Sequence, residues 1–184
     1  GVRTRISYDY LWLPFVTAYY IKHTGDIAIL DASIDFLEGR LLNPDEESYF
    51  DLPLNAHTPA PLYEHCVRAI KHALNFGEKG LPLIGTGDWN DGYNKVGQHG
   101  KGESVWLAFF LYEILNRFGE TAALHNDTTF AETCKKEAIK LKANIDKNAW
   151  DGEWYKRAWF DDGTPLGSKT TEDCKIDSIA QSWS

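Results

Sequence analysis

One short run in the chain carries residue types that could act together on a sugar. Asp88, Trp89, Asn90 and Asp91 are consecutive within a glycine-rich segment, residues 80–106. A carboxyl group can donate a proton, an indole can stack on the face of a pyranose ring, and an amide can hydrogen-bond its hydroxyl groups. The same residues also suit a plain turn, because Asp and Asn side chains often bond to their own backbone. Local chemistry leaves both interpretations open.

Simpler ligand-binding motifs do not fit this run. The Gly-Thr-Gly sequence at 85–87 lacks the third glycine of a dinucleotide-binding loop, since Asn90 stands in that place, and no phosphate-binding Gly-Lys-Ser/Thr follows. A calcium loop that began at Asp88 would need a glycine where the chain has Tyr93. A sugar site is therefore the functional interpretation that remains.

Composition argues against several classes of partner and cofactor. The formal net charge is −8 and the isoelectric point is near 5.2, which disfavours nucleic acid and anionic membrane surfaces as partners. Cys66, Cys134 and Cys174 lack the spacing of zinc ligands or of a disulfide framework, so we expect free thiols, no metal and no cofactor. No apolar run is long enough to cross a bilayer. We therefore expect a cytoplasmic protein, or a soluble domain of an inner-membrane synthase without direct membrane contact.

Apolar residues at helical spacing predict most of the secondary structure. Helices are expected over residues 9–23, 26–37, 58–76, 103–118 and 128–146, with another beginning near residue 176. Asp9 is expected to cap the first helix. Residues 40–61 hold four prolines and are expected to be irregular. Residues 150–160 should form a short extended pair, followed by a turn.

Two of the expected helices differ in how their apolar residues are distributed. Residues 103–118 include the sequence VWLAFFLYEIL, which is apolar nearly all round and is typical of a helix buried on every side. Residues 128–146 carry apolar side chains on one face and lysines mostly on the other, as an outer helix does. An inner helix followed by an outer one predicts an all-α fold, a toroid of two helical layers.

Motifs along most of the chain resemble one enzyme family. The central sequences GTGDWNDGYNKVG and GKGESVWLAFFL are accompanied by RTRISYDYLWLP, LYEHCVRAI, GTPLGS and CKIDSIAQSW. Together they resemble glycoside hydrolase family 94, the inverting disaccharide and oligosaccharide phosphorylases such as those of cellobiose and chitobiose. The resemblance is closest to the phosphorylase-like C-terminal domain of cyclic β-1,2-glucan synthases. It implies an (α/α)6 barrel, of which residues 1–184 would form a single partial catalytic domain.

The resemblance also implies a reaction and its principal residues. Asp91 would be the general acid that protonates the leaving oxygen, while inorganic phosphate, as co-substrate, attacks the sugar from the opposite face. Trp89, Arg3 and Asp9 would bind the sugar whose bond is broken. The alternative for Asp91 is to cap its own turn, and for Arg3 and Asp9 to form an ion pair that holds the N-terminal segment. Asp88 is expected to be structural.

A second group of candidates lies near the end of the chain. By resemblance, Glu172, Lys175 and Gln181 would lie around the scissile bond and the acceptor sugar; alternatively, they cap and solvate the start of a helix. The chain departs from the family pattern at Tyr8, where a second acidic residue is expected, and at Tyr93, where methionine is usual. The first departure leaves the detail of the sugar subsite open.

Three functions are compatible with these residues. The first is part of an inverting phosphorylase that transfers glucosyl units between the non-reducing end of β-1,2-glucan and phosphate. The second is an inverting hydrolase on the same scaffold, which needs a base carboxylate roughly 6.5–9.5 Å from the acid. The third is a non-catalytic carbohydrate-binding fragment. The expected partners are the glucan, phosphate and the remainder of the polypeptide. Because no phosphate-binding residues are recognisable, we expect the isolated chain to be inactive.

Overall fold

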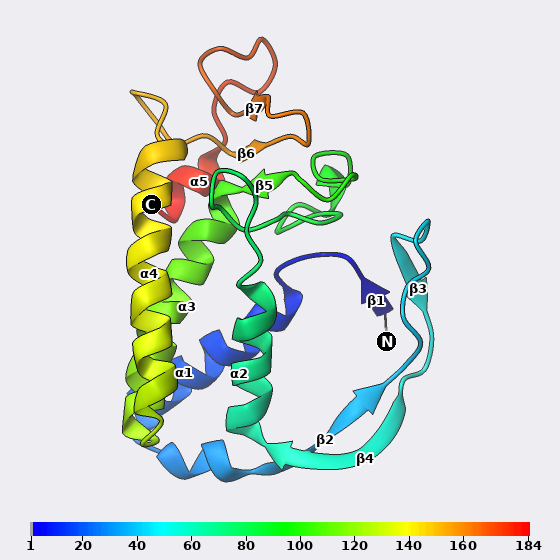
Figure 1. The fold of residues 1–184 in the computed structure, drawn as a ribbon, viewed down its shortest axis with the longest axis vertical. Coiled ribbons are helices and arrows are strands. Elements are labelled where there is room, and N and C mark those ends of the chain that lie inside the picture. The colour runs from blue at the N-terminus through cyan, green and yellow to red at the C-terminus, as the bar shows by residue number, and fades with distance from the viewer. Residues whose placement is uncertain (1) are drawn as a thin grey trace.

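The computed structural model describes residues 2–184 and shows a helical body with a long two-stranded arm (Figure 1). The α-helices are α1 (Trp12–Thr24), α2 (Leu62–Ala73), α3 (Val105–Leu124), α4 (Thr128–Asn148) and α5 (Ser178–Ser182). Three short 3₁₀ helices are η1 (Asp9–Leu11), η2 (Ile27–Asp31) and η3 (Asp91–Tyr93). Loops, short strands and α5 gather at one end of the long helices, and this loop layer contains most of the predicted sugar-site residues.

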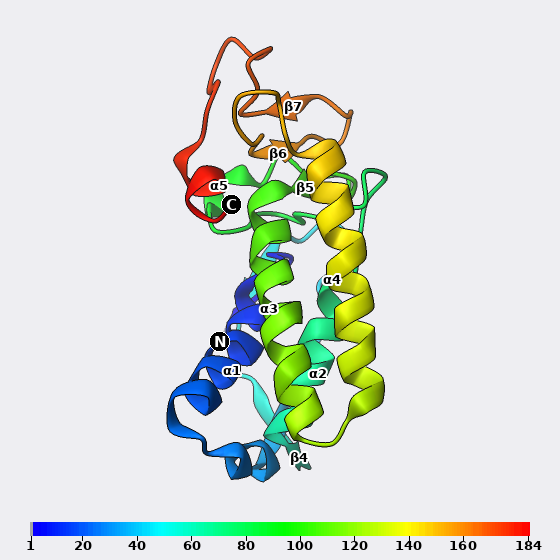
Figure 2. The same ribbon diagram turned by 90° about the vertical axis from the view of Figure 1, so that its left-hand side faces the viewer.

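Helix α3 is the inner helix of the body. Ser104 caps its N-terminus, where the side chain accepts a hydrogen bond from the amide of Leu107 at 3.0 Å. Trp106 and Phe110 are fully buried, and buried residues occur all round the helix. Helix α4 lies beside α3 and packs through one face, while its lysines are exposed (Figure 2). Both the predicted inner helix and the predicted outer helix are therefore confirmed.

Two other helices begin later than the sequence pattern indicates. Asp9 lies in η1 and makes no capping hydrogen bond, so its predicted role as a helix cap is wrong. Helix α1 does end where expected, at Gly25, which takes a left-handed conformation with φ of 74°. Helix α2 begins after Pro61 rather than at residue 58, because Pro59 continues an extended strand.

The arm replaces a helix that the sequence pattern predicts over residues 26–37. After η2 the chain forms strand β2 (Ser33–Glu38), which pairs antiparallel with β4 (Leu54–Pro61). Leu30 is fully buried, whereas Ile34 and Leu37, which share its helical spacing, are exposed on the arm. The prediction of a second long helix is therefore wrong. Pairing with β4 outweighs the helical spacing of four apolar residues, Ile27, Leu30, Ile34 and Leu37.

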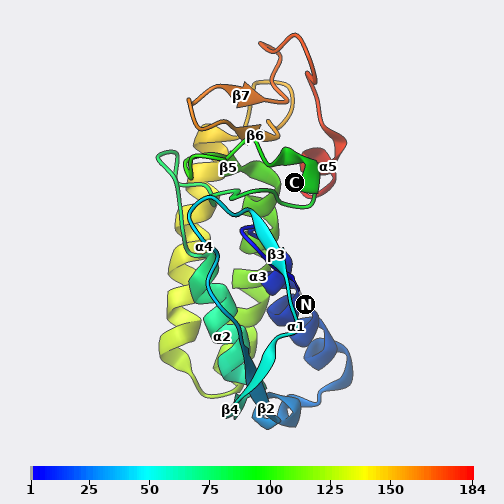
Figure 3. The same ribbon diagram turned by 90° about the vertical axis from the view of Figure 1, so that its right-hand side faces the viewer.

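The tip of the arm returns towards the N-terminus. Strand β3 (Ser48–Phe50) pairs antiparallel with β1 (Val2–Thr4), so residues 40–61 are more regular than their prolines suggest. Figure 3 shows the arm running from the base of the helices towards the loop layer. The arm therefore holds strand β1 near that layer.

A small sheet covers the start of α3. Its strands are β5 (Glu103–Ser104), β6 (Ala158–Trp159) and β7 (Pro165–Leu166), which pair in that order. Asp162 closes the turn between β6 and β7 by accepting a hydrogen bond from the amide of Thr164 at 2.9 Å. Trp150 also bridges to Tyr155, so the predicted extended pair and the turn after it are confirmed.

Helices provide most of the hydrophobic core, as the predicted fold class requires. The arm and the loop sheet do not fit an all-α description, and this part of the prediction is corrected. Within residues 2–184, no helix combines the length and apolar character needed to cross a membrane, and no three metal-ligand side chains gather together. Cys66 and Cys134 are buried free thiols, and Cys174 is an exposed one.

Candidate active site

A tight turn presents Asp91 to solvent. The side-chain oxygen of Asn90 accepts a hydrogen bond from the amide of Gly92 at 2.9 Å and so caps η3. The backbone amide of Asn90 in turn donates to Asp88 at 3.1 Å. The exposed carboxylate of Asp91 makes no hydrogen bond or ion pair with any residue from 2 to 184. The capping of this turn is therefore done by Asn90 and Asp88.

Asp88 lies beneath the turn and is fully buried. Its Oδ2 and Oδ1 accept hydrogen bonds from Nη1 and Nη2 of Arg157 at 2.6 and 2.5 Å, and Oδ2 also accepts from Oγ of Ser104 at 2.5 Å. Because Ser104 caps α3, Asp88 anchors the turn to the start of the inner helix. These contacts confirm that Asp88 is structural.

Trp89 is the exposed member of an aromatic cluster. Its indole is 55% exposed, and ring centroids of Trp106, Tyr8 and Trp12 lie 6.2, 6.4 and 6.5 Å away. Tyr8 packs edge-on against the fully buried Trp106 at 5.5 Å. Tyr8, which stands where the family pattern has an acidic residue, thus packs between the indole of Trp89 and the core. An exposed ring on an aromatic base offers a flat apolar face to a sugar.

The N-terminal segment is bonded to the glycine-rich loop. The amide of Thr86 donates to the carbonyl of Arg5, and the amide of Ser7 donates to the carbonyl of Gly87, both at 3.2 Å. Gly85 makes this approach possible: its φ is 63°, and a Cβ atom there would collide with the carbonyl oxygen of Arg5. The segment that carries Arg3 and Asp9 is therefore fixed beside the turn.

Arg3 and Asp9 line a cavity of about 730 Å³. The end of α2, including His72, contributes to its wall. This volume lies within the usual range for pockets that bind small ligands. Arg3 and Asp9 form no ion pair in the described part of the chain; Arg5 instead fastens the segment by bonding to carbonyls of residues 43–46. The side chain of Arg3 is thus available to the cavity, and the carboxylate of Asp9 lines it while bonded to the hydroxyl group of Tyr8.

Asp91 and Asp9 lie close enough for their charges to interact. Partial burial raises the pKa of Asp9, and the charge of Asp91 raises it further, against a smaller opposing effect of the hydrogen bond with Tyr8. Burial raises the pKa of Tyr8 as well, followed by the charges of Asp9 and Asp91. Asp91 is not part of the cavity wall. Its charge nevertheless acts on Asp9, which does line the cavity.

The second group of predicted residues lies on the loop before α5 and on α5 itself. Glu172 and Lys175 are exposed. Gln181 is half-buried; its amide oxygen accepts from the backbone amide of Tyr155 at 2.9 Å, and its amide nitrogen donates to the carbonyl of Tyr155 at 2.7 Å. This pairing favours the alternative, structural interpretation of Gln181. Glu172 and Lys175 are the members of this group whose exposed side chains make no hydrogen bond or ion pair with residues 2–184.

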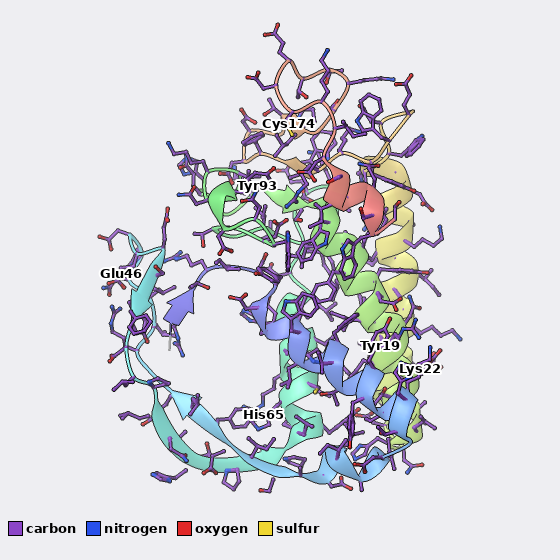
Figure 4. The ribbon with its side chains drawn as sticks, turned by 180° about the vertical axis from the view of Figure 1, so that it is seen from behind. Tyr19, Lys22, Glu46, His65, Tyr93 and Cys174 are labelled. Carbon is purple, nitrogen blue, oxygen red and sulfur yellow. The ribbon has the colours of Figure 1, made fainter. Side chains whose placement is uncertain are left out.

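Tyr93 connects the two groups of predicted residues. Its hydroxyl donates to Oδ2 of Asp177 at 3.2 Å, and Asp177 caps α5 by accepting from the amide of Ile179 at 2.9 Å. Figure 4 shows Tyr93 in the loop layer, near α5. A methionine at this position could not make the contact because it has no hydroxyl group. The second departure from the family pattern therefore adds a link between the turn and α5.

Three residues of the loop layer were not predicted as parts of the site: Arg157, Ser104 and Asp177. Ser104 stands directly before an apolar helix, which is a capping signal that the sequence does contain. Arg157 meets Asp88 across 69 residues of chain, so no local spacing could pair them. Asp177 likewise gains its role from folding, which brings α5 next to Tyr93.

Comparison with known proteins identifies the family. The family model for the catalytic domain of the glycosyl hydrolase 94 superfamily matches residues 1–184. The chain belongs to this family. It is 43% identical to a cyclic beta-(1,2)-glucan synthase, NdvB, of Rhizobium meliloti (strain 1021), over all of the chain. It is also 33% identical to a solabiose phosphorylase and 35% identical to a 3-O-beta-D-glucopyranosyl-beta-D-glucuronide phosphorylase, both of Paenibacillus borealis, over 94% of the chain.

The family members it matches are much longer than this chain. The chain spans 6% of the length of the glucan synthase and 20% of each of the two phosphorylases. Their names describe enzymes that build or phosphorolyse glycosides. Membership of the glycosyl hydrolase 94 family thus places the chain among carbohydrate-active enzymes.

Proposed function

We propose that the chain is part of a domain that catalyses the phosphorolysis of β-linked glucan, with Asp91 as the proton donor. The observation that carries this proposal is the state of Asp91. It is an exposed carboxyl group without a hydrogen-bond or ion-pair partner among residues 2–184, on a turn whose cap is supplied by Asn90, next to the exposed indole of Trp89. The names of the phosphorylase relatives support the reaction class.

The proposed reaction is a single displacement with inversion. The Asp91 carboxyl group gives its proton to the glycosidic oxygen as the bond from that oxygen to the anomeric carbon breaks. An oxygen of inorganic phosphate forms the new bond to the anomeric carbon from the opposite face. The products are glucose 1-phosphate and a glucan shorter by one unit. In the reverse direction the Asp91 carboxylate removes the proton from the acceptor hydroxyl.

The other residues would bind and orient the sugar. Trp89 would stack on the glucosyl ring, while Arg3 and Asp9 would hydrogen-bond its hydroxyl groups from the wall of the 730 Å³ cavity. Lys175 and Glu172 would face the acceptor side from the loop before α5. Gln181 lies on the same side, but both atoms of its amide pair with the backbone of Tyr155, so it would hold α5 in place rather than bind the sugar.

An inverting hydrolase is the second candidate, and the charge interaction between Asp9 and Asp91 is the observation that raises it. A hydrolase needs a carboxylate opposite the acid to activate water. Asp9 would take this role, since its charge interacts with that of Asp91 and it lines the cavity. The two candidates differ in their products, because a phosphorylase releases glucose 1-phosphate and a hydrolase releases free glucose.

The product assay separates these functions. The full-length polypeptide that contains this chain is incubated with β-1,2-glucan, with and without phosphate, and both products are measured. Glucose 1-phosphate that depends on added phosphate and is lost in Asp91→Asn supports the phosphorylase. Free glucose without phosphate supports the hydrolase. Glucan binding without turnover, unchanged by Asp91→Asn, would show a non-catalytic binding module. Asp146→Asn, which changes an exposed carboxylate on α4, is the matched control.

The remaining expectations are part of the same proposal. The chain would act within a larger catalytic domain, an (α/α)6 toroid completed by further segments of the polypeptide. Glucan and phosphate would be its partners, and it would need no cofactor. Phosphorolysis by the 184 residues alone would contradict the expectation that the isolated chain is inactive.

A further inference from the structure

Arg157 is a fully buried cation between the two predicted groups of site residues. Its backbone is fixed on both sides, since its amide donates to the carbonyl of Leu166 at 2.8 Å and its carbonyl accepts from the amide of Val105 at 3.2 Å. Leu166 belongs to β7 and Val105 begins α3. The guanidinium group therefore extends into the loop layer from a point that the sheet and the inner helix both hold.

On one side the guanidinium group holds the turn of Asp91. Both of its terminal nitrogens bond to Asp88, at 2.6 and 2.5 Å. Asp88 also accepts the backbone amide of Asn90, which caps η3. A displacement of Asp88 would carry the cap with it, and Asp91 is the first residue of the helix that the cap holds.

On the other side the guanidinium group faces α5. Nε lies 3.5 Å from Oδ2 of Asp177, an ion-pair contact, and makes no hydrogen bond within the part of the chain that the structure describes. The same carboxylate receives the hydroxyl of Tyr93, and the ring of Tyr93 lies 4.8 Å from Cζ of Arg157. Arg157, Tyr93 and Asp177 thus form one packed group that joins the turn to the start of α5.

The electrostatics suit a fixed junction. Burial by itself lowers the pKa of Arg157, but the hydrogen bonds and charge of Asp88, followed by the charge of Asp177, raise it above its ordinary value. The cation is therefore kept charged in a buried place. A planar guanidinium can bond to one carboxylate with two nitrogens and face a second with the third, which the single ammonium group of lysine cannot do.

We infer that Arg157 is a positioning residue, which holds the turn bearing Asp91 and the α5 segment bearing Lys175 at one relative placement. It would thereby align the proton donor with the acceptor side of the sugar site. The inference rests on the proposed function, because it acts through Asp91. Tyr93 supports the same junction through its hydroxyl group.

The first test compares Arg157→Lys and Tyr93→Phe in the full-length polypeptide, using phosphorolysis of β-1,2-glucan. Misplacement of a catalytic group can lower rates on the order of 100-fold, and we expect a loss of that size in kcat for Arg157→Lys with little change in the KM for glucan. Tyr93→Phe keeps the ring and loses one hydrogen bond, so kcat should fall about threefold to tenfold. Arg68→Lys, which alters an exposed ion pair with Glu64, should leave kcat unchanged.

The second test is a double-mutant cycle that a merely structural role would not satisfy. In the Asp91→Asn background, Arg157→Lys should cost no more than about twofold of the residual rate, because the residue it positions is already disabled. Tyr93→Phe gives the same test if Arg157→Lys does not fold. Unchanged kcat in the single variants, or an equal loss in both backgrounds, would overturn the inference. Absence of glucose 1-phosphate from the unmodified protein would instead overturn the proposed function.

Discussion

The guanidinium group of Arg157 and the carboxylate of Asp88 face each other with two parallel hydrogen bonds, at 2.6 and 2.5 Å, in a fully buried place. Both side chains are shielded from solvent, and each compensates the charge of the other. This ion pair joins the residue directly before β6 to the turn of the predicted proton donor. Removing one partner leaves the other as an uncompensated buried charge.

Asp88→Asn should therefore destabilise the chain strongly. The change removes the negative charge and leaves Arg157 buried with Asp177 as its one ion-pair partner among residues 2–184, so we expect a loss of about 3–5 kcal/mol in the free energy of unfolding. Urea denaturation followed by circular dichroism measures it. Glu64→Gln, which breaks the exposed ion pair with Arg68, should cost about 0–1 kcal/mol. An equal loss of unfolding free energy in the two variants would contradict the claim that burial makes the Asp88–Arg157 pair the more important one.

Trp89→Ala tests the proposed stacking surface. The indole is 55% exposed, so its loss should change the stability of the fold little while removing the flat face that meets the sugar. We expect the KM for glucan to rise about tenfold, or ~1.4 kcal/mol of binding free energy. Leu124→Ala removes a similarly exposed apolar side chain at the far end of α3 and should leave KM as it is. An unaltered KM in Trp89→Ala would argue against stacking on this ring.

Glu103 gives a prediction for the dependence of stability on pH. Burial raises the pKa of this carboxyl group above its ordinary value of 4.5, although hydrogen bonds from the amides of Lys79 and Leu81 oppose the shift. At pH values near and above 4.5, the carboxyl group of Glu103 therefore keeps its proton more readily in the folded chain than in the unfolded chain. The contribution of Glu103 to stability is therefore present at low pH and is lost as pH rises through the raised pKa.

Glu103→Gln should remove this pH dependence. Since glutamine has one side-chain oxygen, one of the two amides loses its partner and the variant should be less stable at low pH. Its free energy of unfolding should nevertheless fall less than that of the unmodified chain between about pH 4 and pH 7. Urea titrations at several pH values measure the slopes, with exposed Glu120→Gln as the control. Parallel slopes for the unmodified chain and Glu103→Gln would contradict this prediction.

The sequence predicted those parts of the fold that depend on local patterns. Helix α3 has apolar residues on all sides, which marks it as an inner helix, and α4 has them on one face, which marks it as an outer helix. In both cases the spacing of apolar residues indicates which faces are buried. The arm was missed because residues 33–38 have the spacing of a helix face but pair with residues 54–61, which are distant in sequence. No local pattern contains that pairing.

The same division applies to the candidate site. Asp88, Trp89 and Asp91 are neighbours in sequence, and the family resemblance marks them, so their loop could be predicted. The buried contacts of Asp88 could not, since Arg157 comes from a different part of the chain. Gln181 also shows the limit of resemblance, because its amide pairs with the backbone of Tyr155 rather than facing open space.

The central claim is that Asp91 donates the proton to the leaving oxygen, and the dependence of rate on the leaving group tests it most directly. In the full-length polypeptide, with phosphate present, Asp91→Asn is compared with the unmodified enzyme on β-1,2-glucan and on an aryl β-glucoside whose phenolate needs no proton to leave. General acid catalysis typically contributes about 10²–10⁴-fold. The account predicts a loss of that size on glucan and a loss below about tenfold on the aryl glucoside. Equal losses on both substrates, or none on glucan, would contradict it.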